Sequence, residues 1–158
     1  MSQCTIINPL ECDHWDQWLV TQKDYSFFHS QAWIRVLQGS YGYHPTFFAS
    51  YPTVERADVV PCMEVNSLLT GKRGVSLPFS DFCEPIVQSQ TRLQEMLKHM
   101  IQFGKRAGWK TIELRFKSKQ LKETDSSQFY LGHQLDLRKG RDALLANIRE
   151  STRRNIKK

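Results

Sequence analysis

The strongest periodic pattern in the chain covers residues 89–103, where apolar side chains recur at helical spacing. The stripe consists of Leu93, Met96, Leu97, Met100 and Ile101. Gly104 follows the stripe together with basic residues, an arrangement typical of a helix end. We therefore expect a helix over about residues 89–103 that buries this stripe and ends at Gly104.

Two shorter helices are predicted nearer the N-terminus. Asn8, Pro9 and Glu11 form a helix start, because asparagine accepts from first-turn amides and proline suits the first helical position. Ser30 is placed to cap a second helix that ends near Gly39. The apolar faces of the two helices are Cys12, Trp15, Trp18 and Leu19, and Trp33, Ile34, Val36 and Leu37.

Strands are indicated by short apolar runs and by strict alternation. Residues 43–51 and 58–65 are separated by a short polar link, which favours an antiparallel pair. Residues 111–116 alternate apolar and polar positions and predict a strand with one buried face. Further strands are expected at residues 5–7 and 129–137, and prolines 45 and 61 are expected at strand ends, edges or bulges.

Two segments between these strands and the long helix lack any regular period. Residues 68–75 are rich in turn formers, and residues 77–85 are interrupted by two prolines. The second segment is the best candidate for an ordered functional loop. The resulting order, β-α-α-β-β-loop-α-β-β-α, predicts an α+β (mixed α/β) fold with a mostly antiparallel sheet flanked by helices.

Charge divides the chain into two parts. Residues 138–158 hold eight basic and two acidic side chains, a net charge of +6, which equals the net charge of the whole protein. Residues 1–137 therefore sum to zero. We expect residues 138–158 to form one basic amphipathic helix attached to a lobe at residues 1–137. Its apolar stripe would be Leu145, Ile148, Thr152 and Ile156, and Arg149, Arg153 and Lys157 would form one basic ridge beside a second one at Glu150, Arg154 and Lys158.

Composition excludes several classes of protein. The length suits one domain, the 40% apolar residues can build a core, and no apolar run reaches the ~20 residues that span a bilayer. No signal peptide is visible at the N-terminus, so a cytoplasmic location is expected. The four cysteines (Cys4, Cys12, Cys62 and Cys83) lack metal-ligand spacing, and neither a metal site nor a cofactor motif is predicted.

No sequence motif identifies a catalytic reaction. Phosphate-binding loops, HExxH and GxSxG are missing, and the five histidines are scattered. His29 precedes a helix start, where a structural role is expected. No catalytic residue is assigned.

Three segments in order resemble one family. Residues 28–37 with 41–45 read FHSQAWIRVL and YGYHP, residues 76–85 read SLPFSDFCEP, and residues 135–137 with 151–158 read LDL and STRRNIKK. Together they resemble the FemAB-like proteins, a branch of the GNAT-like acyltransferases. The similarity covers most of the chain and the first half of such a protein. The acetyl-CoA loop [QR]xxGx[GA] of other GNAT proteins is absent, as in the FemAB-like branch.

This resemblance implies a fold and a function. FemAB-like proteins consist of two GNAT-like halves around a binding cleft, and the best-known members transfer amino acids from aminoacyl-tRNA to peptidoglycan precursors. The basic segment at residues 138–158 would lead into a second half that is missing here, and this half alone would be inactive. Aminoacyl-transferring members tend to carry Arg-Gly-Pro where this chain has Cys83, Glu84 and Pro85, so Glu84 replaces a small residue.

Substrate contacts are expected at two places. Phe79, Ser80 and Asp81 would direct a hydroxyl and a carboxylate toward an amine acceptor, although turn residues of this kind often serve only local capping. Four basic residues, Arg149, Arg153, Arg154 and Lys157, would bind phosphate oxygens of tRNA or of a nucleotide-diphosphate sugar. A solvated helix face explains the same charges equally well.

Three hypotheses follow from these observations. The chain is expected to be the N-terminal lobe of an acyltransferase of cell-wall or exopolysaccharide biosynthesis, with aminoacyl-tRNA or acyl-CoA as possible donors. The alternative is a non-catalytic module that binds tRNA-like polyanions. A third possibility is self-association through Leu145, Ile148 and Ile156, if the apolar stripe lacks its partner.

Overall fold

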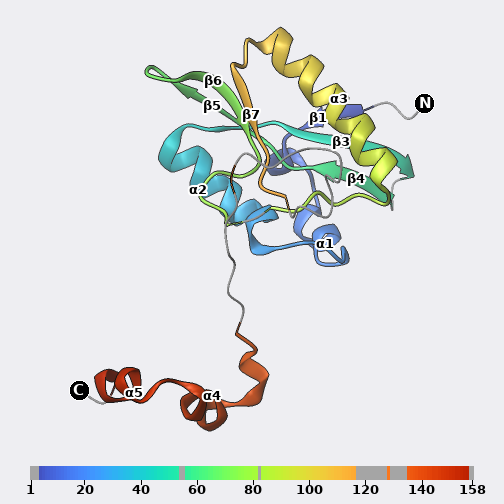
Figure 1. Ribbon diagram of the computed structural model, residues 1–158. Coiled ribbons are helices and arrows are strands. Elements are labelled where there is room, and N and C mark those ends of the chain that lie inside the picture. The colour runs from blue at the N-terminus through green and yellow to red at the C-terminus, as the bar shows by residue number, and fades with distance from the viewer. Residues whose placement is uncertain (1–3, 54–55, 82, 117–127, 129–134, 157–158) are drawn as a thin grey trace. The chain divides into compact units, whose positions relative to one another are not determined.

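The computed structural model describes residues 4–53, 56–81, 83–116, 128 and 135–156 of the 158 residues. The chain divides into two compact units, Met1–Ser126 and Ser127–Lys158. Unit 1 contains every strand that the structure describes (Figure 1). The fold class is α+β, as predicted from the order of the elements.

Unit 1 is built on two small sheets. The first sheet has the order β1-β3-β4 and is antiparallel throughout. The second has the order β2-β5-β6-β7 and is antiparallel except for the parallel pair β6·β7. The strands are β1 (Cys4–Ile7), β2 (His44–Pro45), β3 (Phe47–Thr53), β4 (Arg56–Val60), β5 (Met63–Ser67), β6 (Gly71–Val75) and β7 (Thr111–Glu113).

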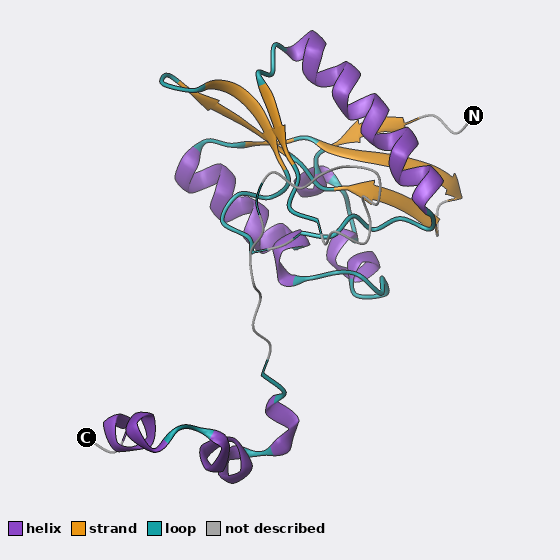
Figure 2. Cartoon of the chain, viewed as in Figure 1, coloured by secondary structure: helices purple, strands orange, loops and turns teal. Residues whose placement is uncertain are grey.

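Helices cover both faces of this strand layer (Figure 2). The α-helices of unit 1 are α1 (Trp15–Leu19), α2 (Gln31–Tyr41) and α3 (Gln90–Ala107), and short 3-10 turns occupy η1 (Pro9–Glu11) and η2 (Phe27–His29). One core cluster joins α1 and α2 to Phe47, whereas a second joins α3 to Phe48. Neighbouring residues of β3 thus enter opposite cores, which explains why the strand begins with three apolar residues in a row, Phe47–Ala49.

The predicted antiparallel pair is confirmed, but each predicted strand is divided between the two sheets. β3 pairs with β4 in the first sheet, whereas β2 pairs with β5 in the second. Pro45 ends β2, and Pro61 lies between β4 and β5. Both prolines therefore lie where the chain changes sheet, because a residue without an N–H cannot continue a ladder.

The predicted cap at Ser30 is confirmed, Ser89 caps the long helix in the same way, and the predicted helix ends are wrong. Ser30 accepts from the N–H of Trp33, and Ser89 accepts from that of Arg92. Helix α2 ends at Gly42 (φ +67°) instead of Gly39, and α3 ends at Gly108 (φ +77°) instead of Gly104. A Cβ at Gly104 would lie 2.8 Å from the Trp109 ring, so that glycine permits close packing and does not end the helix.

The first predicted helix is interrupted. Asn8 accepts from the N–H of Leu10 and donates to Glu11 at 2.8 Å, so the expected start is present. The turn that follows is a 3-10 turn ending at Glu11, and His14 (φ +61°) separates it from α1. A left-handed residue cannot continue a right-handed helix, so two short elements replace one.

Residues 68–75 contain a strand that the turn-rich composition obscured. Gly71–Val75 forms β6, which makes a hairpin with β5 and pairs in parallel with β7. The expected loop at residues 77–85 carries no helix or strand in its described part. The polar loop expected at residues 118–127, and residues 129–134 of a further predicted strand, lie outside the described residues.

Unit 2 does not form the single basic helix that the sequence predicted. It contains η4 (Leu137–Lys139), α4 (Arg141–Asn147) and α5 (Glu150–Ile156). Ile148 adopts an extended conformation (ψ 139°) between the two helices and therefore breaks the predicted apolar stripe. No described residue of unit 2 is buried.

Among the described residues, no helix has both the length and the apolar character needed to span a bilayer.

Candidate functional site

The loop between β6 and α3 is held against the extension of β7. The N–H of Ser76 donates to the carbonyl of Glu113 at 2.9 Å, and the N–H of Arg115 donates to Ser76 Oγ at 2.7 Å. Further along, the N–H of Cys83 donates to the carbonyl of Arg115 at 2.9 Å. Both ends of an irregular segment are thus bonded to one strand-like neighbour, which gives the loop a defined shape.

The guanidinium of Arg115 fixes the middle of the same loop. Its Nη1 donates to the carbonyl oxygen of Ser80 at 2.7 Å, and its Nε donates to the carboxylate of Glu113 at 2.7 Å. A planar guanidinium with several fixed donors suits this double role. Arg115 belongs to the polar face of the predicted strand at residues 111–116, and no sequence signal assigned it this role.

Two non-glycine residues of the loop adopt left-handed backbone conformations. Leu77 has φ +46° and Phe79 has φ +60°. A left-handed conformation costs roughly 1 kcal/mol for a residue other than glycine, so other contacts must stabilise Leu77 and Phe79 in it. Complete burial of Leu77 supplies that stabilisation at the first position. Phe79 is 55% exposed, so the core does not explain its conformation.

Phe79 instead lies in a group of aromatic rings at the surface. Its ring centroid is 4.7 Å from that of Tyr41 and 6.5 Å from that of Tyr43, and the two tyrosine rings are stacked at 5.4 Å. Tyr41 is 52% exposed and Tyr43 is partly buried. We call these three residues the aromatic ledge. It joins the end of α2 to the loop, and its two tyrosines belong to the family-like segment at residues 41–45.

The other two predicted loop residues have different roles. Ser80 is buried, and its hydroxyl donates to the carbonyl of Leu77 at 2.5 Å. The prediction that Ser80 offers its hydroxyl to a substrate is therefore wrong, because the local cap weighed against it is what the structure contains. Asp81 is exposed and remains available to a ligand.

A buried histidine connects α2 to the far end of the loop. His29 Nδ1 accepts from the N–H of Ser26 at 3.1 Å, so the proton of the neutral ring lies on Nε2, which donates to the carbonyl of Glu84 at 2.9 Å. Burial lowers the pKa of His29. The expected structural role of His29 is confirmed.

Cys83 lies beside this ring without forming a catalytic pair. Its Sγ is 3.4 Å from His29 Nε2. The protonated Nε2 cannot take the thiol proton, and burial raises the pKa of Cys83 well above its usual range. A nucleophile needs a thiolate and an available base, so this contact serves packing.

The basic residues predicted to bind substrate belong to unit 2. Arg149, Arg153 and Arg154 are exposed, and Lys157 lies outside the described residues. The N–H of Arg153 donates to the carbonyl of Arg149 at 3.0 Å, so these two keep helical spacing and part of the predicted ridge is present. Arg138 of the same unit is instead paired with Asp136 at 2.9 Å, and this bond lowers the pKa of Asp136.

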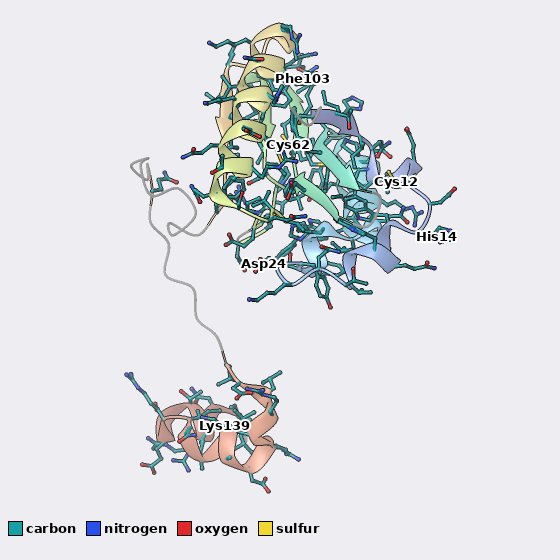
Figure 3. All side chains as sticks on the ribbon, turned by 90° about the vertical axis from the view of Figure 1, so that its right-hand side faces the viewer. Cys12, His14, Asp24, Cys62, Phe103 and Lys139 are labelled. Atoms are coloured by element: carbon teal, nitrogen blue, oxygen red, sulfur yellow. The ribbon has the colours of Figure 1, made fainter. Side chains whose placement is uncertain are left out.

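The described residues contain no cluster of side chains suited to bind a metal ion. Within those ranges, no group of three or more His, Cys, Asp or Glu side chains could hold a metal ion. Figure 3 shows Cys62 among the strands, whereas Cys12 and His14 lie in the segment before α1. A cavity of about 150 Å³ between residues 22–24 and 86–88 contains none of the predicted site residues.

No family model, curated protein or solved structure matches the chain.

Proposed function

We propose that unit 1 is the acceptor-binding lobe of a FemAB-like acyltransferase. The observation that supports this proposal is the aromatic ledge, in which an exposed phenylalanine holds a left-handed conformation two residues before an exposed carboxylate at Asp81. Backbone strain of this kind concentrates at ligand sites, where the surrounding structure must over-determine it. The same loop carries the segment that resembles the family.

The chemistry of the ledge suits an amine acceptor. Tyrosine and phenylalanine faces attract an ammonium group, and a carboxylate pairs with it. In the proposed reaction the ammonium first loses one proton to water, and the neutral amine nitrogen then forms an amide bond to the acyl carbon of the donor. The ester bond of aminoacyl-tRNA or the thioester bond of acyl-CoA breaks, and the released oxygen or sulfur takes up the second proton that the nitrogen loses. We assign unit 1 the binding of the acceptor and not the catalytic step.

Binding of an amine-bearing probe tests this proposal. The full chain is titrated with lysyl-D-alanyl-D-alanine, and the amide and aromatic signals of the protein are followed by NMR. We expect saturable shifts at Tyr41, Phe79 and Asp81. Phe79→Ala and Asp81→Asn should each weaken the affinity about five- to thirtyfold, since each removes a contact of order 1–2 kcal/mol.

The control is Tyr25→Ala, which removes another aromatic ring that is 46% exposed and lies outside the loop. It should leave the affinity unchanged. Equal loss in Tyr25→Ala and Phe79→Ala, or shifts that spread over the whole surface, would contradict the assignment of the ledge as the acceptor site.

The exposed arginines of unit 2 favour a second candidate function, the binding of tRNA or another polyanion. Their guanidinium groups face solvent and can each form two bonds to a phosphate. Binding of unfractionated tRNA should weaken steeply with salt, because bound counterions are released. Arg149→Glu combined with Arg153→Glu should abolish this binding. An affinity that changes neither with salt concentration nor with these two substitutions would exclude this function.

A further inference from the structure

The tip of the β5–β6 hairpin presents two leucines to solvent. Leu68 is 108% exposed and Leu69 is 95% exposed, the highest values among the large apolar side chains for which exposure is described. The hairpin projects from one end of unit 1 (Figure 1). The two side chains therefore form a protruding apolar point instead of a flat patch.

Formation of the turn does not require these leucines. Ser67 Oγ accepts from the N–H groups of Leu69 and Thr70, both at 3.3 Å, and Gly71 (φ +77°) supplies the left-handed position that closes a three-residue hairpin loop. Polar residues and glycine usually occupy such loops. Because Leu68 and Leu69 contribute neither to the turn nor to a core, their apolar character needs another explanation.

Basic residues surround the base of the hairpin. Lys72 and Arg73 follow the turn on β6, and Lys110 approaches Gly71 so closely that a Cβ there would lie 2.8 Å from the lysine Cε. The N–H of Lys110 donates to the carbonyl of Lys72 at 2.8 Å, which brings the end of α3 to the hairpin. That helix end adds Lys105 and Arg106, both exposed.

One acidic group offsets part of this charge, because Glu64 pairs with Lys72. Glu64, the carboxylate on β5, is 3.4 Å from Lys72 Nζ and accepts from Trp109 Nε1 at 2.7 Å. Four of the exposed acids belong to residues 11–24, the segment that contains α1: Glu11, Asp13, Asp16 and Asp24. The exposed Glu113 on β7 is bonded to Arg115. Basic side chains thus outnumber acidic ones around the hairpin, and Lys105, Arg106 and Lys110 are its exposed cations.

We propose that this tip binds the surface of an anionic lipid bilayer. Leu68 and Leu69 enter the boundary between headgroups and acyl chains, while Lys105, Arg106 and Lys110 face the lipid phosphates. An apolar group flanked by basic side chains is the combination that peripheral membrane binding requires. A protein partner would be expected to bury a broader apolar patch than two side chains at a point. This binding does not depend on the acyl-transfer proposal, because it involves none of the ledge residues.

Vesicle flotation with the full chain tests the proposal. Wild-type protein should float with vesicles that contain about one third phosphatidylglycerol, and much less with pure phosphatidylcholine. Leu68→Ser combined with Leu69→Ser should weaken partitioning at least about tenfold, since two apolar side chains no longer leave water. Lys110→Glu should weaken it about fivefold or more through the loss of attraction to the anionic surface.

The matched control is Leu135→Ser combined with Leu137→Ser. It also removes two exposed leucines, each 70% exposed. The net charge is unchanged, so any attraction of the basic residues at 138–158 to lipid is the same in both variants. This control should float like wild type. The midpoint of urea unfolding should be the same in all three proteins, because none of the four leucines is buried.

Three outcomes would overturn the proposal. The first is wild-type protein that does not bind anionic vesicles, and the second is equal flotation of wild type and Leu68→Ser/Leu69→Ser. The third is a wild-type dimer, measured by light scattering without lipid, that the tip variant dissociates, which would assign the tip to a second copy of the chain.

Discussion

His29 Nε2 donates to the carbonyl oxygen of Glu84 at 2.9 Å, which joins the start of α2 to the end of the candidate loop. The residues are 55 positions apart, and both are buried. The bond fixes a neutral ring in one tautomer, so it links the protonation state of one histidine to the stability of the loop.

Acidification should destabilise the protein through His29. Burial lowers the pKa of His29 in the folded state below the ordinary value of 6.5. The unfolded chain then binds more protons, so the free energy of unfolding falls as pH drops below about 6.5, by at most ~1.4 kcal/mol per pH unit. Urea unfolding between pH 7.5 and 5.5 measures this slope. His29→Gln should lower stability at pH 7.5 and flatten the slope, whereas an unchanged slope in the variant would contradict the assignment.

Loss of the Arg115 guanidinium should loosen the loop. Arg115→Met removes the bonds to Ser80 and Glu113 while keeping most of the side-chain volume. We expect a loss of about 1–2 kcal/mol in the free energy of unfolding, together with faster hydrogen exchange at Cys83. Arg35→Met, on the exposed face of α2, is the control and should change neither quantity.

Phe79 allows backbone strain to be separated from ring contacts. Phe79→Ala removes the ring and keeps the unfavourable φ of +60°, whereas Phe79→Gly removes the ring and relieves the strain. Phe79→Gly should therefore be more stable than Phe79→Ala by about 1 kcal/mol in urea unfolding. If Phe79→Ala is as stable as Phe79→Gly or more stable, residue 79 does not keep the left-handed conformation in solution.

Two glycine-to-alanine changes should have opposite effects. A Cβ at Gly74 would overlap the ring of Trp109, so Gly74→Ala should cost at least about 2 kcal/mol. A Cβ at Gly39 would meet nothing within 4 Å, and that residue lies inside α2. Gly39→Ala should raise thermal stability by about 0.5–1 kcal/mol, because alanine favours the helix. Scanning calorimetry measures both, and destabilisation by Gly39→Ala would show that α2 is not helical there.

Unit 2 should promote self-association. Its helices have seven residues each and no described residue of the unit is buried, while Ile156 is 60% exposed. Helices this short are marginal in water unless they pack against something. Light scattering at high protein concentration should therefore detect dimers or larger species, and Ile156→Ser should reduce them. A clean monomer at every concentration would contradict this expectation.

Local features were predictable from the sequence because they depend on neighbouring residues. The Ser30 cap and the apolar stripe of α3 follow from the spacing of residues over one or a few turns. The fold class follows from the order of these elements. The irregular character of residues 77–85 was predictable for the same reason, because closely spaced prolines interrupt regular bonding.

The candidate site depended on contacts between distant segments. The bond from Ser80 to Leu77 is local, whereas the bond from Arg115 to Ser80 and the ring contact of Phe79 with Tyr41 join residues that 35 or more positions separate in the chain. No local pattern encodes such distances. Gly104 is the same kind of case, because only the position of the Trp109 ring shows why it is a glycine.

Charge shows the same division between sequence and structure. The sequence by itself determined that residues 1–137 have equal numbers of acidic and basic side chains and that the excess positive charge lies at residues 138–158. Only the tertiary structure decided that Lys105, Arg106 and Lys110, at and after the end of α3, lie near Lys72 and Arg73 of the hairpin. A sum over residues contains no positions, whereas an electric field depends on where each charge lies once the chain has folded.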